Sequence, residues 1–253
     1  MTSHSGLPHL LRRIARPGTS QPRPRSGKFF AALIVAVLSG AMVAGQEDVT
    51  VEEEPAKKPD DHKTFLLASP KFFESWEHYS AEQGTQRVDV WRIIPEKAVT
   101  ENNGETIENV LICTGKPFGY LRSKEVYENC QIGLQWRFPK DDNGNSGVLV
   151  YVDGKDEIWP KSIQVQLHRP KVGGVFPMKD ATCDPHLPGK MLEKPATEWN
   201  SCIITCRDGT IALEINGQDF GVVKGCMPAK GFIALQSEGA EVHFRQIWRR
   251  PLK

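Results

Sequence analysis

Short runs of alternating hydrophobic and polar residues fill the C-terminal part of the chain. Three consecutive runs are separated by Asp208-Gly209 and Asn216-Gly217, and they cover residues 201–206, 210–215 and 218–223. Asp-Gly and Asn-Gly between alternating runs are strong signals for tight hairpin turns. The pattern therefore predicts a meander of three antiparallel strands. Because side chains alternate between the faces of a strand, one set of the middle run should face the core, namely Ile211, Leu213 and Ile215.

Further β signals lie on both sides of this meander, separated by turn-forming residues. The expected strands cover residues 131–138, 147–152, 161–168, 231–236 and 242–249. Residues 70–79 predict one short helix, and helical periodicity is otherwise scarce. Many short strands at turn-separated intervals are typical of an all-β protein. We therefore expect an antiparallel β-sandwich of the jelly-roll type.

The first 45 residues have the pattern of a secretory signal peptide. Six basic and no acidic residues precede or flank an apolar run from Phe29 to Ala44, which ends in small residues. An uncleaved membrane anchor is the alternative, but the run is shorter than the roughly 20 apolar residues that span a bilayer. We expect export with cleavage before Gln46 and no stable membrane insertion afterwards. The expected location is the periplasm or the outside of the cell.

Removing this leader changes the charge of the chain. Lys and Arg fall from 32 to 26 while all 31 Asp and Glu remain, so the formal net charge goes from +1 to −5. This mildly acidic charge argues against nucleic acid as a partner, because phosphate binding needs clustered basic charge. Residues 46–63 are rich in acidic residues and predict a disordered linker. Residues 64–253 are then long enough for one domain with a sizeable core.

All six cysteines follow the leader, at Cys113, Cys130, Cys183, Cys202, Cys206 and Cys226. An oxidising destination permits disulfides, although spacing does not fix their pairing. Cys202 and Cys206 on one strand would have Cα atoms about 13 Å apart, which is too far for a bond. Free buried thiols and one or two disulfides both stay open.

The first candidate for chemistry is the polar side of the strand 161–168. There Gln164, Gln166 and His168 share one face, opposite an apolar face. This row suits sugar hydroxyl groups, and we predict that it lines a binding groove; an exposed polar face is the alternative. Jelly-roll glucanases that retain configuration place two carboxylates about 5 Å apart on such a strand. The amides here disfavour an ordinary two-carboxylate glycosidase.

Other candidates lie at strand ends. Asn145-Ser146-Gly147 enters a strand, where its polar groups either bind ligand or serve the turn alone. Glu238, next to Gln236, is a candidate general base, with a solvated turn glutamate as the alternative. A divalent metal stays open as a cofactor; its candidate ligands are His168, His186 and His243, although no spacing requires one. Three aromatic residues could stack on sugar rings or pack in the core, namely Tyr151, Trp159 and Trp199.

Several stretches of the chain are individually weak motifs but specific when taken together. They are Gly119-Tyr-Leu-Arg122, Asn145-Ser-Gly-Val148, Trp159-Pro-Lys-Ser-Ile163, Glu198-Trp-Asn200 and Leu235-Gln-Ser-Glu-Gly239. In this order they resemble the 3-keto-disaccharide hydrolase domain family of secreted bacterial proteins. The resemblance covers essentially the whole predicted domain and implies a concanavalin A-like glucanase fold.

The resemblance also implies a chemistry. In a glycoside oxidised at C3, the ketone acidifies the proton on C2, so that a base removes it, the C1 substituent leaves and water adds. For this chemistry we assign Glu238 or His168 as the base, as a hypothesis. We further expect substrate contacts from Asn145, Ser146, Gln164, Gln166, Gln236, Tyr151, Trp159 and Arg122. Members of the family commonly carry an acidic residue where this chain has Gln164, so activity would be altered if that carboxylate takes part.

Three functions therefore compete. The resemblance favours a secreted hydrolase of 3-keto-glycosides that is supplied by a separate sugar oxidoreductase. The amide-rich strand and Gln164 favour a non-catalytic carbohydrate-binding module. A protein-interaction sandwich fits if the chain neither binds nor cleaves sugars.

Overall fold

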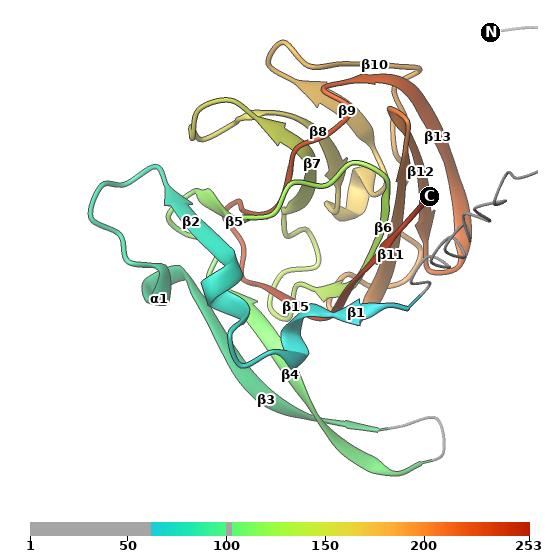
Figure 1. Cartoon of the computed structure of the whole chain (residues 1–253). Coiled ribbons are helices and arrows are strands. Elements are labelled where there is room, and N and C mark those ends of the chain that lie inside the picture. The colour runs from blue at the N-terminus through green and yellow to red at the C-terminus, as the bar shows by residue number, and fades with distance from the viewer. Residues whose placement is uncertain (1–61, 100–102) are drawn as a thin grey trace, which may run out of the picture. The chain divides into compact units, whose positions relative to one another are not determined.

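The fold is a sandwich of two sheets. The computed structural model describes residues 62–99 and 103–253, so the predicted leader (1–45) and nearly all of the predicted linker (46–63) lie outside the described residues. The described strands form a nine-stranded sheet and a six-stranded sheet, and all their pairings are antiparallel. Figure 1 shows the two sheets as facing layers, with the one labelled helix at a connection. The expected antiparallel β-sandwich is confirmed.

The large sheet has the spatial order β10 (Thr182–Asp184), β13 (Gln218–Met227), β12 (Thr210–Ile215), β11 (Asn200–Arg207), β6 (Cys130–Arg137), β15 (Val242–Pro251), β4 (Glu105–Cys113) and β3 (Trp91–Val99), and β1 (Thr64–Phe65) also pairs with β15. The small sheet has the order β2 (Trp76–Ser80), β5 (Gly119–Ser123), β14 (Phe232–Ser237), β7 (Gly147–Asp153), β8 (Lys161–Gln166) and β9 (Val175–Met178). The helical turns are η1 (Leu66–Ala68), η2 (Phe72–Ser75), α1 (Arg87–Val90) and η3 (Arg169–Lys171).

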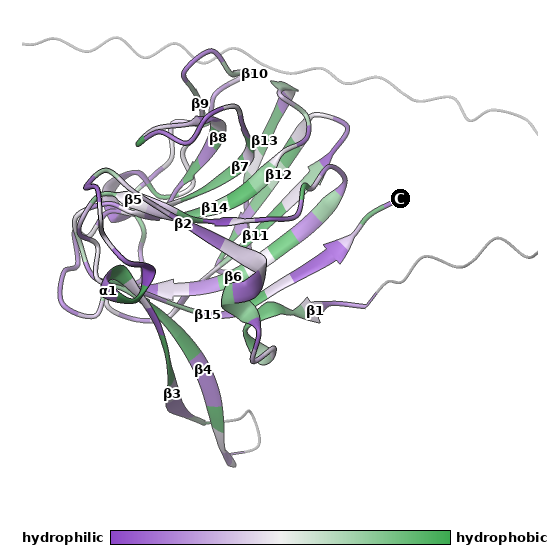
Figure 2. Ribbon diagram, turned by 60° about the vertical axis from the view of Figure 1, so that its left-hand side comes forward, coloured by the Kyte–Doolittle hydropathy of each residue, from purple (hydrophilic) through white to green (hydrophobic). Residues whose placement is uncertain are grey.

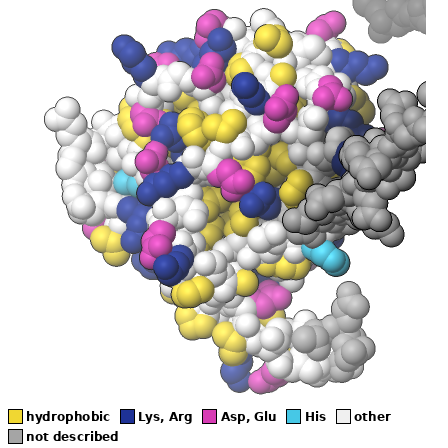
Figure 3. All heavy atoms as spheres, in the orientation of Figure 1, with side chains coloured by type: hydrophobic (Ala, Val, Ile, Leu, Met, Phe, Trp, Pro, Cys, Tyr) yellow, Lys and Arg dark blue, Asp and Glu magenta, His cyan; other side chains and the backbone are white. Residues whose placement is uncertain are grey.

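The core lies between the two sheets. Trp136 and Ile204 of the large sheet and Val148 and Val165 of the small sheet are buried in one continuous hydrophobic cluster. Figure 2 shows the alternation of hydrophobic and hydrophilic segments along several strands that this arrangement requires. In Figure 3, hydrophobic side chains are visible near the centre of the view, and charged side chains of both signs surround them. Each strand therefore presents one side to the core and the other to the outside.

The predicted meander is confirmed as β11, β12 and β13. Asp208 and Gly209 have φ values of 49° and 69°, and Asn216 and Gly217 have 50° and 75°. Two consecutive positive φ values define the type I′ turn, whose twist matches that of the flanking strands. The middle strand buries its predicted set, Ile211, Leu213 and Ile215.

The single helix predicted over residues 70–79 is wrong. A short 3₁₀ turn covers Phe72–Ser75, and Trp76–Ser80 is a strand that pairs with β5. Phe72 and Trp76 are both buried and their rings stack with centroids 5.2 Å apart. Pairing at the sheet edge thus outweighs the local helical spacing of the aromatic residues. Across the described ranges, no helix is long and apolar enough to cross a bilayer.

Candidate functional site

Three adjacent strands of the small sheet bring most of the predicted polar residues onto its outer face. Leu235 of β14 lies opposite Val148 of β7, and Gly147 lies opposite Gln166 of β8. The amide of Leu167 donates to the Ser146 carbonyl at 3.1 Å, which carries the pairing one residue further. Because side chains alternate, two rows of outward-facing residues cross these strands. One row is Gln236, Gly147 and Gln166; the next, here called the edge row, is Glu238, Asn145 and His168.

Glu238 is the electrostatically distinctive member of the edge row. Burial raises the pKa of its carboxyl from 4.5 to about 7, and a hydrogen bond with the Asn145 side chain opposes that shift. Glu238 Oε2 and Asn145 Oδ1 are buried acceptor atoms that have no hydrogen-bond partner within the described part of the chain. A carboxyl group with such a pKa exchanges protons near neutral pH, as a general acid or base requires. Both free oxygens are suited to a ligand's hydroxyl donors.

Two buried glutamines lie behind the edge row. Gln236 Nε2 donates to Gln164 Oε1 at 3.4 Å, above the backbone of β7. A Cβ atom on Gly147 would lie 2.3 Å from Gln236 Oε1 and 3.2 Å from Gln164 Nε2. Only glycine therefore gives this amide pair its room. Ser146 supports the pair from within, because its buried hydroxyl donates to the Gln236 carbonyl at 2.9 Å.

The loop between β7 and β8 crosses the outer face of the small sheet. Asp156 of this loop accepts a hydrogen bond from Tyr120 Oη at 2.7 Å and forms an ion pair with Arg122 Nη1 at 3.1 Å. Both partners lie on β5, and β14 separates β5 from β7. At the same face the rings of Trp159 and Phe118 lie with centroids 6.4 Å apart. The loop therefore reaches over β14 to β5.

The structure corrects the predicted groove. Gln164 is 4% exposed and Gln236 is fully buried, so the amide row does not line an open groove along its whole length. Gln166 turns back to its own backbone, where its Oε1 accepts from the amides of Leu167 and His168. The three side chains of the edge row are half-buried and therefore partly accessible. Arg122 lies on the predicted face, but Glu77 and Asp156 both bind it.

The predicted substrate contact from Tyr151 is wrong. Tyr151 has a φ of 57° at an irregularity of β7, where the pairings with β8 and β14 both shift register. The extra residue inverts the alternation: Tyr151 joins the core cluster, whereas Val152 joins Tyr120 and Leu149 in a separate cluster. Its hydroxyl lies beside the thiol of Cys206 instead of on the outer face.

The three histidines proposed as metal ligands do not form one group. His243 belongs to β15 of the large sheet, where its Nε2 lies 2.9 Å from Glu241 Oε1. His168 follows β8 of the small sheet, and His186 is exposed between β10 and β11. In residues 62–99 and 103–253, no three His, Cys, Asp or Glu side chains cluster as metal ligands do.

The ring of Trp199 packs against two arginines of the large sheet and not at the edge row, where it would have to lie to stack on a bound sugar. The guanidinium groups of Arg137 and Arg245 each lie 4.4 Å from the centroid of its ring. Both arginines belong to the large sheet, so Trp199 lies apart from the edge row on the small sheet. Its contacts are those of cation–π packing.

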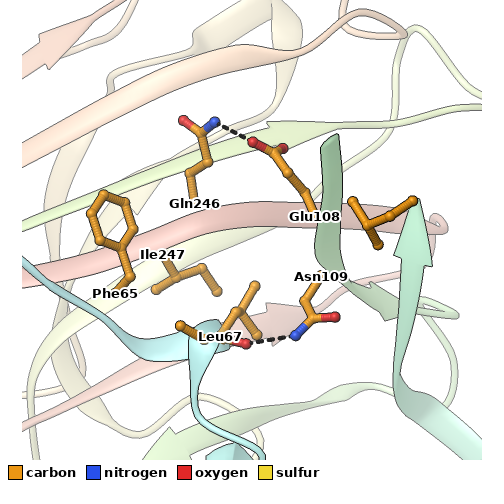
Figure 4. Close-up of a pocket in the computed structure, with 8 residues that line it drawn as sticks. Phe65, Leu67, Glu108, Asn109, Gln246 and Ile247 are labelled. Atoms are coloured by element: carbon orange, nitrogen blue, oxygen red, sulfur yellow. Dashed lines mark hydrogen bonds between the residues drawn. The ribbon is translucent and has the colours of Figure 1, made fainter. Parts of the chain in front are cut away.

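A cavity of about 450 Å³ lies beside the large sheet, at η1, β4 and β15. Figure 4 shows that its polar groups are paired: Gln246 donates to Glu108 at 2.9 Å and Asn109 donates to the Leu67 carbonyl at 2.9 Å. None of the predicted site residues lines this cavity. We therefore place the candidate site at the edge row.

Sequence reasoning missed the aromatic residues on the outer face of the small sheet. Tyr79 and Tyr120 stack with ring centroids 5.0 Å apart on β2 and β5. Phe118 lies beside Trp159 and comes within about 3.5 Å of the Cβ position of Gly239. The signal was present for Tyr120, because it lies two residues before Arg122 on one strand and so shares its face.

A known family covers most of the described chain. The profile of the 3-keto-alpha-glucoside-1,2-lyase-like domain family matches residues 72–250. The chain belongs to this family. Membership makes it a carbohydrate-active protein. The edge row on the outer face of the small sheet is the candidate site for the carbohydrate. No curated protein matches the chain.

Two solved structures of candidate glycosyl hydrolases from Parabacteroides distasonis are similar to this family member. One is 21% identical with a TM-score of 0.52, and it aligns over 76% of this chain and 100% of its own. The other is 17% identical with a TM-score of 0.52, over 76% and 94%. At such identities the likeness concerns the fold, and it agrees with the concanavalin A-like jelly roll.

Proposed function

We propose that this protein cleaves glycosides that carry a ketone at C3, by removal of the C2 proton, elimination of the C1 substituent and addition of water. The observation that carries the proposal is the Glu238 carboxyl, whose pKa burial raises to about 7, in one row with Asn145 and His168. Family membership supports the choice of substrate class. Retaining hydrolysis needs two neighbouring carboxylates, whereas the strand 161–168 carries amides at Gln164 and Gln166, so elimination is the better fit.

Glu238 is the proposed base. Its carboxylate takes the proton from C2, and the electron pair moves to the C3 oxygen as an enolate. Asn145 holds the carboxylate by a hydrogen bond and leaves Glu238 Oε2 free to accept. Collapse of the enolate then expels the C1 oxygen, and water adds to C1 in the last step. This route needs one base and one proton donor.

His168 is the proposed partner for the leaving oxygen. It follows β8, whereas Glu238 follows β14, and β7 lies between these strands. Neighbouring strands lie about 4.8 Å apart, so the two backbones are roughly 10 Å apart. That separation leaves room for a sugar ring between the side chains. The His168 side chain is half-buried, so it is partly open to a ligand.

The amide pair of Gln164 and Gln236 is the proposed orienting element. Gln236 lies two residues before Glu238 and Gln164 lies four residues before His168, and the pair is held by burial, Gly147 and Ser146. Gln236 Oε1 has no hydrogen-bond partner in the described part of the chain, so the pair keeps an unused acceptor behind the edge row.

The test is turnover of a 3-keto-disaccharide, followed by release of monosaccharide. The unoxidised disaccharide is the matched substrate control, because it lacks the ketone that acidifies C2. We expect the wild-type protein to cleave the 3-keto-disaccharide and not the unoxidised disaccharide. We expect Glu238→Gln to lose this turnover. Assays with and without a chelator test whether a divalent metal takes part. Equal cleavage of both substrates would exclude the elimination route.

A non-catalytic carbohydrate-binding module is the second candidate. It is favoured by the buried amide pair, because Gln164, where the family resemblance implies an acidic residue, binds Gln236 instead. Calorimetric binding of the 3-keto-disaccharide without any release of monosaccharide would establish it.

Two further proposals concern the setting of this reaction. The leader composition supports export to the periplasm or beyond. A substrate with a ketone at C3 must come from oxidation of the C3 hydroxyl, so a sugar oxidoreductase acts before this protein. Fractionation of cells and sequencing of the mature N-terminus, expected at Gln46, tests the first proposal.

A further inference from the structure

Four of the six cysteines lie as two pairs on neighbouring strands. Cys206 of β11 is directly opposite Cys130 of β6. Between β10 and β13, Thr182 pairs with Met227 and Asp184 with Lys224, so Cys183 lies at an irregularity that faces Gly225 and Cys226, and its side chain contacts that of Cys226. All four side chains are buried in the core, and all are free thiols in the structure.

The backbone geometry of such pairs suits a disulfide. Residues directly opposite each other on antiparallel strands have Cα atoms about 4.5 to 5.5 Å apart, and disulfides join Cα atoms about 4.4 to 6.8 Å apart. The side chains of opposite residues also leave the sheet on the same face. Side-chain hydrogen bonds join the two thiols within each pair, Cys130 with Cys206 and Cys183 with Cys226.

Other pairings among these four residues are excluded by the strand order. The two pairs are close enough to influence each other electrostatically, since the charge of Cys226 contributes to raising the pKa of the Cys206 thiol. However, β12 lies between β11 and β13, so the backbones that carry these two cysteines are about 10 Å apart. That exceeds the span of a disulfide.

The remaining two cysteines have no such partner. Cys202 lies opposite Ile215 on one side and Leu134 on the other. Cys113 lies opposite Trp91 and Val242. Burial raises the pKa of the Cys113 thiol to about 12, which keeps it protonated and unreactive.

We propose that Cys130–Cys206 and Cys183–Cys226 are disulfide bonds in the mature protein, and that Cys113 and Cys202 stay as thiols. The oxidant is a small-molecule or protein disulfide. One thiolate of a pair attacks a sulfur of that oxidant and expels one of its thiolates; the second cysteine then attacks the mixed disulfide and expels the other. Each bond thus reduces one oxidant disulfide to two thiols, which receive the two protons.

Cys130 is the natural first nucleophile of its pair. The hydrogen bond from Cys206 lowers the pKa of the Cys130 thiol, and the positive charge of Arg249 acts in the same direction. The second bond would fix β10, a strand of three residues at the edge of the large sheet. Such a short edge strand has few pairings of its own, so a covalent link restrains it.

The test does not depend on where the protein is located. The full chain is unfolded with reducing agent and refolded in a buffer of oxidised and reduced glutathione. Remaining thiols are then alkylated without reduction, and peptides are mapped by mass spectrometry. We expect alkylation at Cys113 and Cys202 only, with two linked peptide pairs, 130–206 and 183–226. Alkylation of all six residues, or any other linkage, would overturn the proposal.

Two serine variants give a matched comparison. Cys130→Ser should lose one of the two bonds and leave Cys206 as an additional free thiol. Cys202→Ser should keep both bonds and lose only one free thiol. Both are buried cysteines on strands of the same sheet, so a general effect of the substitution would appear in both. Equal numbers of bonds in the two variants would contradict the assignment.

Discussion

The buried carboxyl of Glu238 makes the stability of this protein depend on pH. Its pKa is raised from 4.5 to about 7, with burial as the main cause. Between these values the folded state binds more protons than the unfolded state, so stability falls as pH rises. The cost of ionising the buried group is absent below about pH 4.5 and fully present above about pH 7. Glu238→Gln removes this cost and keeps the shape of the side chain.

The size of the effect follows from the pKa shift. One pKa unit corresponds to about 1.4 kcal/mol, which sets an upper limit of about 3 kcal/mol for this shift. Glu238 is only partly buried, and solvent reduces the value, so we expect a gain of roughly 1–2 kcal/mol for Glu238→Gln at pH 8. At pH 4.5 the gain should nearly vanish. The same variant should lose about 10²- to 10⁴-fold in turnover, the usual contribution of a general base.

Urea unfolding of both proteins at pH 4.5 and pH 8 measures this gain. Glu128→Gln is the matched control, because Glu128 is exposed and its replacement removes no buried charge. We expect the control to show no such gain at pH 8. The reasoning would be refuted if Glu238→Gln destabilised the protein at pH 8, or if its effect were the same at both pH values.

Three further substitutions test the surroundings of the site. Gly147→Ala would place a methyl group 2.3 Å from Gln236 Oε1, and we expect the displaced amide to lower kcat/KM by up to about 100-fold; unchanged kinetics would contradict this. Asn145→Ala removes the hydrogen bond that lowers the Glu238 pKa, so the rising limb of the pH–rate profile should move to higher pH, and a move to lower pH would contradict it. Ser146→Ala removes a buried hydrogen bond to the Gln236 carbonyl and should cost about 1–3 kcal/mol in urea unfolding, whereas a neutral result would show that the bond is not needed.

The fold could be predicted where local signals agree with the final structure. The meander is such a case, because Asp208-Gly209 and Asn216-Gly217 fix both turns and the alternation fixes the buried face. The predicted helix over residues 70–79 is the opposite case. There the pairing of β2 with β5, which joins residues far apart in the sequence, decides the conformation.

The site could be predicted only as far as the alternation of side chains holds. Glu238, Asn145 and His168 come together because three strands pair in register. Tyr151 does not join them, because an irregularity of β7, where Tyr151 has a positive φ, turns its side chain into the core. No turn motif in the sequence predicts this irregularity. Gln164 is buried although it lies on the outer face of its strand, and spacing along the chain does not reveal such burial.

The fate of the hydrogen on C2 tests the proposed mechanism most directly. A 3-keto-disaccharide with deuterium at C2 is cleaved in ordinary water, and the products are examined by mass spectrometry. If Glu238 removes this atom, the deuterium is lost to solvent and the cleavage shows a primary isotope effect. Products that keep all their deuterium, formed at the same rate as from the unlabelled sugar, would contradict the elimination route.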